Sequence, residues 1–438
     1  MTTDFEATLD TRIDGILDAC TACGACVEVC PTPAIAGIKG TPESIAAGVL
    51  DVLRDGNGLD ASEHWARVCC GSGFCINACE HGINPRFMLM MARRAMKRDL
   101  PEVDRREAGK VDFKAMSRGV GIITRLQMPL EVMQRLSPSS HPERDTPPDL
   151  IFYTGCNMPK TPHIGLLCLD VLDRLGASYE VHGGPSNCCG ILQMRQGDMA
   201  NGGRQLAKTM ERYTATGAQE VLSWCPTCHM QFDEAAPSKA FDTAMFPVYL
   251  ARRLDDLKPL MTEPVEKRVA LHEFPGSAGV TEGVEALLSA IPGLELVRLE
   301  LPDDVPRAGY QTFSLGTVPD FRKRHLAETF RAAERAGVTA LCSVYHGDHR
   351  ELAGHEGAWP FEFVNYMELI GASMGIRHED SLKQLKLMSD VDTILEAVAD
   401  QVALYDLDAD EVRQIIADEL LGERILPADP AAHPDGSS

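Results

Sequence analysis

Long apolar runs are missing from this 438-residue sequence, and so is an excess of positive charge. No stretch of 18 or more apolar residues occurs, which predicts no direct insertion into a membrane. The first ten residues carry acids and no apolar core, unlike a secretory signal peptide. With 42 basic and 64 acidic residues the net charge is −22, which disfavours nucleic acid and anionic membrane surfaces as partners. We therefore expect a cytoplasmic protein, peripheral to a membrane only where a partner subunit holds it there.

Nucleotide-binding motifs are also missing. The glycine pairs Gly183-Gly184 and Gly202-Gly203 do not lie in a GxGxxG context, and no flavin or nicotinamide motif is present. A partner must therefore supply any two-electron chemistry in which this chain takes part.

Cysteine, in contrast, is abundant, with 15 residues. An odd number in a long chain without an export signal argues against a disulfide framework and favours metal ligation by thiolates. Thirteen of the cysteines form three groups with ligand-like spacing. Of the other two, Cys168 stands among leucines on an expected helix and is interpreted as a core residue, and Cys342 is isolated.

The middle group consists of three islands in which 31 residues separate Cys156 from Cys188 and 35 separate Cys189 from Cys225. Its five members are Cys156, Cys188, Cys189, Cys225 and Cys228. Strand-like runs at 149–153 and 221–224 precede two of the islands, and helical stretches at 164–175 and 204–213 lie between them. This βαβ order places the islands at the carboxyl ends of parallel strands, where ligands gather. The alternative is a set of buried, inert thiols.

The spacing resembles the cysteine-rich "CCG" domain of heterodisulfide reductase B and D subunits. The same domain occurs in the iron–sulfur subunits of glycolate, glycerol-3-phosphate and lactate oxidation. The resemblance implies that all five cysteines bind a noncubane [4Fe-4S] cluster and form the catalytic centre.

The N-terminal group begins with a bacterial ferredoxin run that ends in Cys30-Pro31. Its four members are Cys20, Cys23, Cys26 and Cys30. In such runs three thiolates wrap one cubane cluster and the fourth serves a second cluster. The sequence predicts a ferredoxin-type [4Fe-4S] cluster here.

A second run follows with irregular spacing, and its members are Cys69, Cys70, Cys75 and Cys79. Ser72 stands where a cysteine is usual, and Cys70 is additional. Cross-ligation predicts one cluster on the first three cysteines of the N-terminal run plus Cys79. The other cluster would use Cys30, Cys69 and Cys75, with Ser72, Cys70 or no residue as the fourth ligand, and is therefore [4Fe-4S] or [3Fe-4S]. We favour Cys70.

Helices are expected between and after the runs. Helix-start signals at Thr41 and Asp60 give the segment 41–65 a resemblance to the helical insert of heterodisulfide reductase C subunits. Residues 85–98 form an amphipathic pattern with several methionines, interpreted as packing beneath the clusters.

The fold class predicted is α/β, with an α-helical two-run ferredoxin-like domain, two Rossmann-like CCG modules of which the second is degenerate, and a C-terminal helical segment. The boundaries expected are a dicluster domain at 1–98, a linker with helices at 99–148, the first module at 149–260, a second module without ligands at 261–380, and helices with a disordered tail at 381–438.

The second module rests on an internal repeat at an offset of 120, in which Arg204-Gln-Leu-Ala matches Arg324-His-Leu-Ala. Allowing a short gap, Cys225 matches Cys342, and Cys228 and His229 match Tyr345 and His346. The remaining ligand positions fall on Gly276, Ala308 and Gly309. One thiol cannot hold a four-iron cluster, so this module is predicted to carry none. Its histidines (His272, His346, His349 and His355) are interpreted as hydrogen-bonding residues.

Two functions follow from the resemblance. In the first, an oxidoreductase subunit relays electrons between ferredoxin-type clusters and a noncubane cluster that acts on a small thiol or disulfide. In the second, an electron-transfer subunit serves a flavoprotein dehydrogenase and passes electrons to quinone. Other redox subunits, either a flavoprotein or a membrane quinone-reactive subunit, are the expected partners in both. An open pocket beside the five thiols would favour the first function, and a closed site the second.

Overall fold

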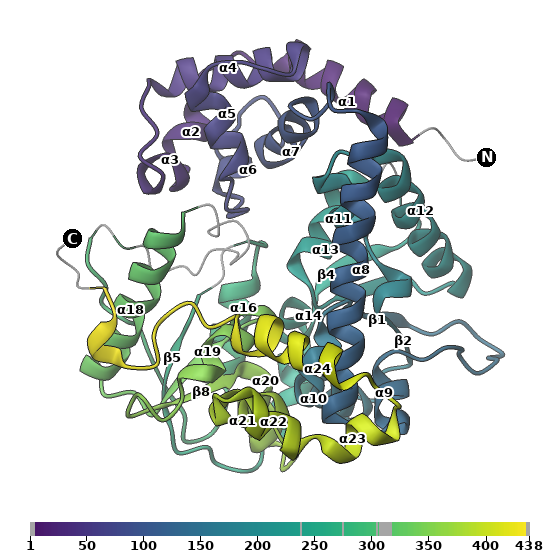
Figure 1. The fold of residues 1–438 in the computed structure, drawn as a ribbon, viewed down its shortest axis with the longest axis vertical. Coiled ribbons are helices and arrows are strands. Elements are labelled where there is room, and N and C mark those ends of the chain that lie inside the picture. The colour runs from purple at the N-terminus through teal and green to yellow at the C-terminus, as the bar shows by residue number, and fades with distance from the viewer. Residues whose placement is uncertain (1–4, 237–238, 274–275, 304, 306–317, 435–438) are drawn as a thin grey trace.

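The structure is a computed structural model that describes residues 5–236, 239–273, 276–303, 305 and 318–434. Seven helices form the N-terminal domain, at the top of Figure 1. They are α1 (Phe5–Ala19), α2 (Ala25–Glu28), α3 (Thr32–Ile35), α4 (Pro42–Asp55), α5 (Asp60–Arg67), α6 (Phe74–Asn77) and α7 (Pro85–Ala95).

Local sequence accounts for several of the helix starts. Thr41 caps α4 by accepting a hydrogen bond from the backbone N–H of Ser44 at 3.2 Å, as its helix-start signal predicted. Asn84 caps α7 in the same way, with Pro85 at the first helical position. The apolar face of α7 is buried against α4 and α5, which confirms the predicted packing for Met88 and Met91, whereas Met90 is only partly buried.

Two parallel sheets carry the rest of the fold, which confirms the predicted class. The first sheet has the order β2-β1-β3-β4, from the strands β1 (Leu150–Gly155), β2 (Tyr179–Gly183), β3 (Glu220–Ser223) and β4 (Asp242–Met245). Its helices are α10 (Pro162–Arg174), α11 (Ile191–Arg195), α12 (Met199–Thr216), α13 (Pro226–Met230), α14 (Phe246–Arg252) and α15 (Leu254–Leu257).

The second sheet repeats this order as β6-β5-β7-β8. Its strands are β5 (Arg268–Leu271), β6 (Glu295–Val297), β7 (Ala340–Ser343) and β8 (Glu362–Asn365). Its helices are α16 (Val280–Ser289), α18 (Pro319–Arg335), α19 (His346–Leu352) and α20 (Tyr366–Ser373). The two modules share one apolar core, in which Trp224 stacks on Tyr366 with ring centroids 5.8 Å apart.

From the third strand of each module onward the repeat holds at 120 residues, without the predicted gap. The strands β7 and β8 begin 120 residues after β3 and β4, and α19 begins 120 residues after α13. Cys342 is therefore the counterpart of Leu222, inside a strand, and not of Cys225. The position of Cys225, at the N-cap of its helix, is taken by Tyr345, and the matches of Cys228 and His229 move to Asp348 and His349. The predicted gap was wrong because it was placed to pair Cys225 with Cys342, whereas β3 and β7 align without a gap.

Where the structure describes it, the second module thus has no cysteine at the positions of Cys225 and Cys228. Gly276 is described, whereas the predicted matches Ala308 and Gly309 lie outside the described residues. The loss of the ligand set persists under the corrected alignment.

The segment expected to be a linker forms α8 (Glu102–Gln127), a helix of 26 residues, and α9 (Leu130–Leu136). Figure 1 shows α8 running from the N-terminal domain along the first module to the C-terminal helices. These are α21 (Ser381–Met388), α22 (Val391–Ala397), α23 (Ala399–Leu404) and α24 (Ala409–Ile415). Apolar residues of α8 share a core with α21, α22 and α24. The segment 99–148 is therefore packed into the fold and supports the C-terminal helices.

The C-terminal predictions were partly wrong. In the C-terminal helices Ile394 and Val398 are buried, whereas Leu404 is 66% exposed. The described part of the tail predicted to be disordered is held in place by contacts with the second module. Arg331 of α18 donates to the carbonyl of Pro434 at 2.8 Å, and the His433 ring packs on Trp359. Composition suggested disorder because these long-range contacts leave no periodic pattern.

Short 3-10 and π helices complete the description: η1 (Met158–Lys160), η2 (Pro185–Asn187), η3 (Gln231–Ala235), η4 (Lys258–Leu260), η5 (Ala353–His355), η6 (Ile416–Leu421) and η7 (Pro430–Ala432). Among the described helices, none has the length and apolar character needed to cross a membrane.

Candidate metal centres

The five central cysteines meet at the carboxyl edge of the first sheet. Cys156 follows β1, the pair Cys188-Cys189 follows β2, and Cys225 follows β3 as the N-cap of α13, which contains Cys228. The strand order makes β2, β1 and β3 neighbours, so their carboxyl ends lie side by side. Sequence islands 31 and 35 residues apart thereby become one group of thiols.

Hydrogen bonds between thiols connect the whole group. Cys188 contacts both Cys156 and Cys189, and Cys228 contacts both Cys189 and Cys225. Donation from Cys188 and Cys228 lowers the pKa of Cys189 to about 6. Donation from Cys228, helped by backbone N–H groups at the start of α13, lowers the pKa of Cys225 to about 7. The pKa is thus lowered towards the metal-binding thiolate form at Cys189 and Cys225, whereas the pKa values of Cys156, Cys188 and Cys228 are raised.

The donor set fits an iron–sulfur cluster. Three of the sulfurs, those of Cys188, Cys189 and Cys228, are at most 2% exposed, and the other two are half-buried. Further donors surround them: Asn157 Nδ2 lies 3.4 Å from Cys156 Sγ, and the backbone N–H of Gly190 lies 3.4 Å from Cys188 Sγ. Soft sulfur ligands with hydrogen bonds from the protein are what iron–sulfur clusters require.

Two glycines make this packing possible. Gly155 and Gly190 have φ values of 76° and 78°, in the left-handed region. A Cβ atom on Gly190 would lie 2.2 Å from the carbonyl oxygen of Gly202, and one on Gly155 would lie 3.0 Å from Cys225 Cβ. The glycine after the paired cysteines is thus required both by backbone conformation and by the approach of α12.

In the N-terminal domain, Cys20, Cys23, Cys26 and Cys79 line one small cavity. Burial raises the pKa of Cys26 to about 12, and the nearby Cys20 and Cys23 add to the rise. These four were expected to share a cluster by cross-ligation, and the structure brings them together. Their role as ligands stays a prediction.

The other four cysteines of this domain form a second group. Cys75 interacts with Cys69 and Cys30, and Cys70 interacts with the same two. Trp65 Nε1 donates to Cys30 Sγ at 3.3 Å. The arrangement matches the second ligand set proposed from the sequence.

Cys70 is buried and is held in place by hydrogen bonds. It accepts a hydrogen bond from Thr32 Oγ1 at 3.3 Å and another from the backbone N–H of Ser72. Burial, followed by the charge of Cys69, raises its pKa to about 12. Because Cys70 approaches Cys30 and Cys69, it remains our choice over Ser72 as the fourth ligand.

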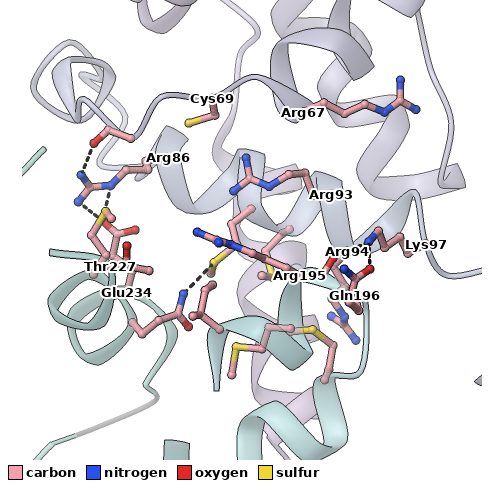
Figure 2. A pocket seen from close by; sticks show the side chains of 18 of the residues that line it. Arg67, Cys69, Arg86, Arg93, Arg94, Lys97, Arg195, Gln196, Thr227 and Glu234 are labelled. Atoms are coloured by element: carbon pink, nitrogen blue, oxygen red, sulfur yellow. Dashed lines mark hydrogen bonds and ion pairs between the residues drawn. The ribbon is translucent and has the colours of Figure 1, made fainter. Parts of the chain in front are cut away.

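A cavity of ≈ 600 Å³ lies between the N-terminal domain and the first module. Cys69 lines it from the N-terminal domain and Thr227, between Cys225 and Cys228, lines it from the module (Figure 2). The second ferredoxin-type group thus contributes a thiol to the wall, whereas the five-thiol group is linked to it through Thr227 and through Arg195, which interacts with Cys189 and Cys225. The sequence gives no sign of this cavity, because its walls come from separate domains.

Positive charge and methionine dominate the walls of this cavity. The basic residues are Arg67, Arg86, Arg93, Arg94, Lys97 and Arg195. The methionines are Met90, Met91, Met96, Met194, Met199 and Met230. In a chain of net charge −22, such a concentration of positive charge favours an anionic occupant.

Two of these guanidinium groups face one another. Figure 2 shows Arg93 from α7 and Arg195 from α11 pointing into the middle of the cavity, whereas Arg67 extends away from them. The protein packed around Arg195 removes water from its guanidinium group, which lowers its pKa, and the like charge of Arg93 lowers it further. The only acid in the cavity wall that the structure describes, Glu234, is paired with Arg86, whose Nε lies 2.8 Å from Glu234 Oε1. Arg93 donates to the Ala66 carbonyl at 2.7 Å and has no carboxylate partner among the described residues.

Comparison with known proteins defines the class. Residues 150–233 match the family model of a cysteine-rich domain, and residues 15–36 match that of a 4Fe-4S binding domain. The chain is therefore an iron–sulfur protein of the oxidoreductase class, and it resembles the electron-transfer subunits of reductases. The matched ranges contain all five central cysteines and the complete first ferredoxin run.

Particular relatives confirm the resemblance to heterodisulfide reductases. The D subunit of the dihydromethanophenazine:CoB–CoM heterodisulfide reductase of Methanosarcina acetivorans is 25% identical over 326 residues, which cover 65% of this chain and 75% of the relative. The corresponding protein from Methanosarcina mazei is 24% identical with the same coverage. The B subunit of a fumarate reductase (CoM/CoB) from Methanothermobacter marburgensis is 24% identical over 229 residues, which cover 50% of this chain and 45% of that protein.

Proposed function

We propose that the chain is a heterodisulfide-reductase-like subunit that relays electrons between two ferredoxin-type clusters and a noncubane [4Fe-4S] cluster acting on a thiol or disulfide. The observation that carries this proposal is the cavity beside the five thiols. An electron-transfer subunit without a substrate has no need of a cavity there, whereas a small disulfide has to reach the cluster. The cavity volume of ≈ 600 Å³ is within the range of small-molecule sites.

The side chains of the cavity suggest how a substrate is held. The guanidinium groups of Arg93 and Arg195 suit a carboxylate, sulfonate or phosphate, to which arginine can donate two parallel hydrogen bonds. The methionine side chains provide adaptable apolar contact for the body of the molecule. The Arg86–Glu234 pair holds α7 against the π helix that follows α13.

When bound, the clusters would supply electrons one at a time, so two successive transfers deliver the pair that a disulfide needs. With two protons from solvent, the disulfide bond breaks and two thiols form. The partner that supplies the electrons is proposed to be a flavoprotein or a membrane quinone-reactive subunit. The relatives are themselves described as subunits of reductases, which supports a multi-subunit setting.

The test uses the full-length protein, purified without oxygen and reduced with dithionite. Mixing with 3,3′-dithiodipropionate, an anionic disulfide, is expected to reoxidise the clusters faster than mixing with the neutral bis(2-hydroxyethyl) disulfide. The variant Arg195→Met should slow reoxidation by the anionic disulfide about tenfold, because roughly one charged contact is lost. Reoxidation by the neutral disulfide should not change.

Arg67→Met is the matched control, because Arg67 is paired with Glu63 at 2.6 Å and extends away from Arg93 and Arg195. It should reoxidise like the unmodified protein, and every variant should be compared at equal iron content. If no disulfide reoxidises the reduced chain but a quinone does, the disulfide proposal fails. The chain then acts as the electron-transfer subunit of a flavoprotein dehydrogenase.

A further inference from the structure

Four metal-binding side chains meet where the two modules contact each other, outside the three cysteine groups. His163 lies in the first turn of α10, in the first module. His349 and Glu368 come from α19 and α20 of the second module, and Asp380 is the N-cap of α21. One ligand atom from each residue can be chosen so that all four lie within 4.8 Å of one another.

The distances describe a compact group. His163 Nδ1 is 3.4 Å from Asp380 Oδ1, and His163 Nε2 is 3.9 Å from Glu368 Oε2. His349 Nε2 is 2.6 Å from Asp380 Oδ2, and His349 Nδ1 is 4.0 Å from Glu368 Oε2. The side chains of both histidines are 0% exposed, that of Asp380 is 6% exposed, and that of Glu368 is 20% exposed.

The hydrogen bonding of this group is incomplete. Neither ring nitrogen of His163 has a hydrogen-bond partner within the described structure, and His349 Nδ1 has none either. A buried polar atom without a partner is destabilising, so native proteins supply a side chain, a water molecule or an ion. The ring of His163 lies beside two carboxylates and a second imidazole, which is a set of metal ligands rather than a set of hydrogen-bond donors.

Backbone contacts already hold the carboxylates in place. Asp380 Oδ1 accepts from the backbone N–H of Lys383 at 3.0 Å, and Glu368 Oε2 accepts from that of Asn365 at 2.6 Å. Such contacts orient ligands around metals in proteins. The ammonium group of Lys383 contacts Glu356 at 3.0 Å and the Phe363 carbonyl at 3.1 Å, so a carboxylate outside the group pairs with its charge.

We propose that His163, His349, Glu368 and Asp380 hold one zinc ion that joins the two modules. Two imidazole nitrogens and two carboxylate oxygens in an enclosed site suit tetrahedral zinc better than calcium or magnesium, which prefer six or more oxygen ligands. Zinc bonds of about 2.0–2.1 Å place tetrahedral ligands roughly 3.4 Å apart, so the side chains need to move by about an ångström or less. With four protein ligands the zinc is structural and leaves no position for a substrate.

The first experiment measures metals in the full-length holoprotein, purified without oxygen from cells grown with zinc. One zinc per chain is expected in addition to the cluster iron. His163→Gln and Asp380→Asn should each lose the zinc while keeping the iron content and visible absorption. Cys342→Ala and Asp170→Asn are matched controls, because Cys342 is a buried thiol near Glu368 and Asp170 is paired with His378, and both variants should retain zinc.

X-ray absorption at the zinc edge of the unmodified protein gives a second readout that does not depend on the variants folding. Only nitrogen and oxygen are expected around the zinc. Sulfur in that shell would place zinc in the cysteine groups and overturn the proposal. So would a protein without zinc, another metal in its place, or full retention of zinc by His163→Gln.

Discussion

The two modules of this protein have the same strand order, yet the five-thiol group lies in the first alone among the described residues. In the first module the N-cap of the helix after the third strand is Cys225, and in the second it is Tyr345. The residue three positions later is Cys228 in one and Asp348 in the other. The sheet and its helices persist without the ligands because an apolar core shared by both modules supports them. The five thiols are thus a set of side chains placed on a sheet architecture that also forms without them in the second module.

The largest difference between the modules should appear when one cysteine is replaced in each. Cys225→Ser should abolish the noncubane cluster, with loss of about four irons per chain, because removing a thiolate costs metal binding and folding energy together. Cys342→Ser should keep all iron and cost roughly 1–2 kcal/mol at most, because Cys342 is a buried strand residue. Iron and acid-labile sulfide should be measured on both variants. Equal loss of iron from the two variants would contradict this prediction.

The next comparison concerns two glycines with left-handed backbones. Gly190→Ala should lower the free energy of unfolding by about 2–5 kcal/mol, because the new Cβ adds a collision with the Gly202 carbonyl to the backbone strain. Gly337→Ala in the second module, with φ of 63° and no atom within 4 Å of the new Cβ, should cost only about 1–2 kcal/mol. Denaturant midpoints of the two variants measure the difference in stability. A larger shift for Gly337→Ala than for Gly190→Ala would contradict the collision expected at Gly202.

The two ferredoxin-type groups offer a similar contrast. Cys70→Ala should convert the second group's cluster from four irons to three, because Ser72 supplies only a hydroxyl, a poorer ligand for iron than a thiolate. Electron paramagnetic resonance of the oxidised protein reports this, since [3Fe-4S]⁺ is paramagnetic and [4Fe-4S]²⁺ is not. Thr32→Val, which removes a hydrogen bond to Cys70 but no thiol, is the control. A strong three-iron signal in the unmodified, anaerobically prepared protein would show that Cys70 is not a ligand.

The smallest effect concerns Tyr153 of β1 and His272, the residue directly after β5. Strand register matches Tyr153, whose hydroxyl donates to the Asn187 carbonyl at 2.8 Å, with His272, whose ring nitrogens have no partner in the described structure. Burial lowers the pKa of His272 to about 3, from an ordinary value of 6.5. The unfolded chain therefore binds a proton below pH 6.5 that the folded protein does not, and His272 reduces stability as the pH falls towards 3.

His272→Phe should remove this loss. Relative to the unmodified protein, the free energy of unfolding of the variant should rise by about 1.4 kcal/mol for each pH unit below 6.5. Urea unfolding at pH 7.0, 6.0 and 5.0 tests it. A difference between the two proteins that does not change with pH would mean that folding leaves the pKa of His272 at its ordinary value.

Much of the candidate site could be predicted because its ligands are close together in sequence. The Cys20–Cys30 run and the Cys225–Cys228 pair each bring their sulfurs together within a few residues, so spacing alone indicates metal chemistry. Strand-like and helical runs between the central islands were also sufficient to predict the parallel sheet, which the structure confirms.

Other features were settled only by tertiary structure. The alignment of the second module required strand register, because a gap that paired Cys225 with Cys342 looked equally good in sequence. The segment 99–148 is packed into the fold because its apolar residues meet helices almost 300 positions later, for example Ile122 and Ile416 in one core.

The sequence by itself determined the class of protein, because thiolate ligands must follow one another at short, fixed intervals to wrap a cluster. It could not indicate the basic cavity, whose facing residues Arg93 and Arg195 belong to separate domains. Nor could it indicate the group of His163, His349, Glu368 and Asp380, since no short spacing links α10 to α21. Those two sites exist because the chain folds distant helices against one another, and only packing decides which side chains then meet.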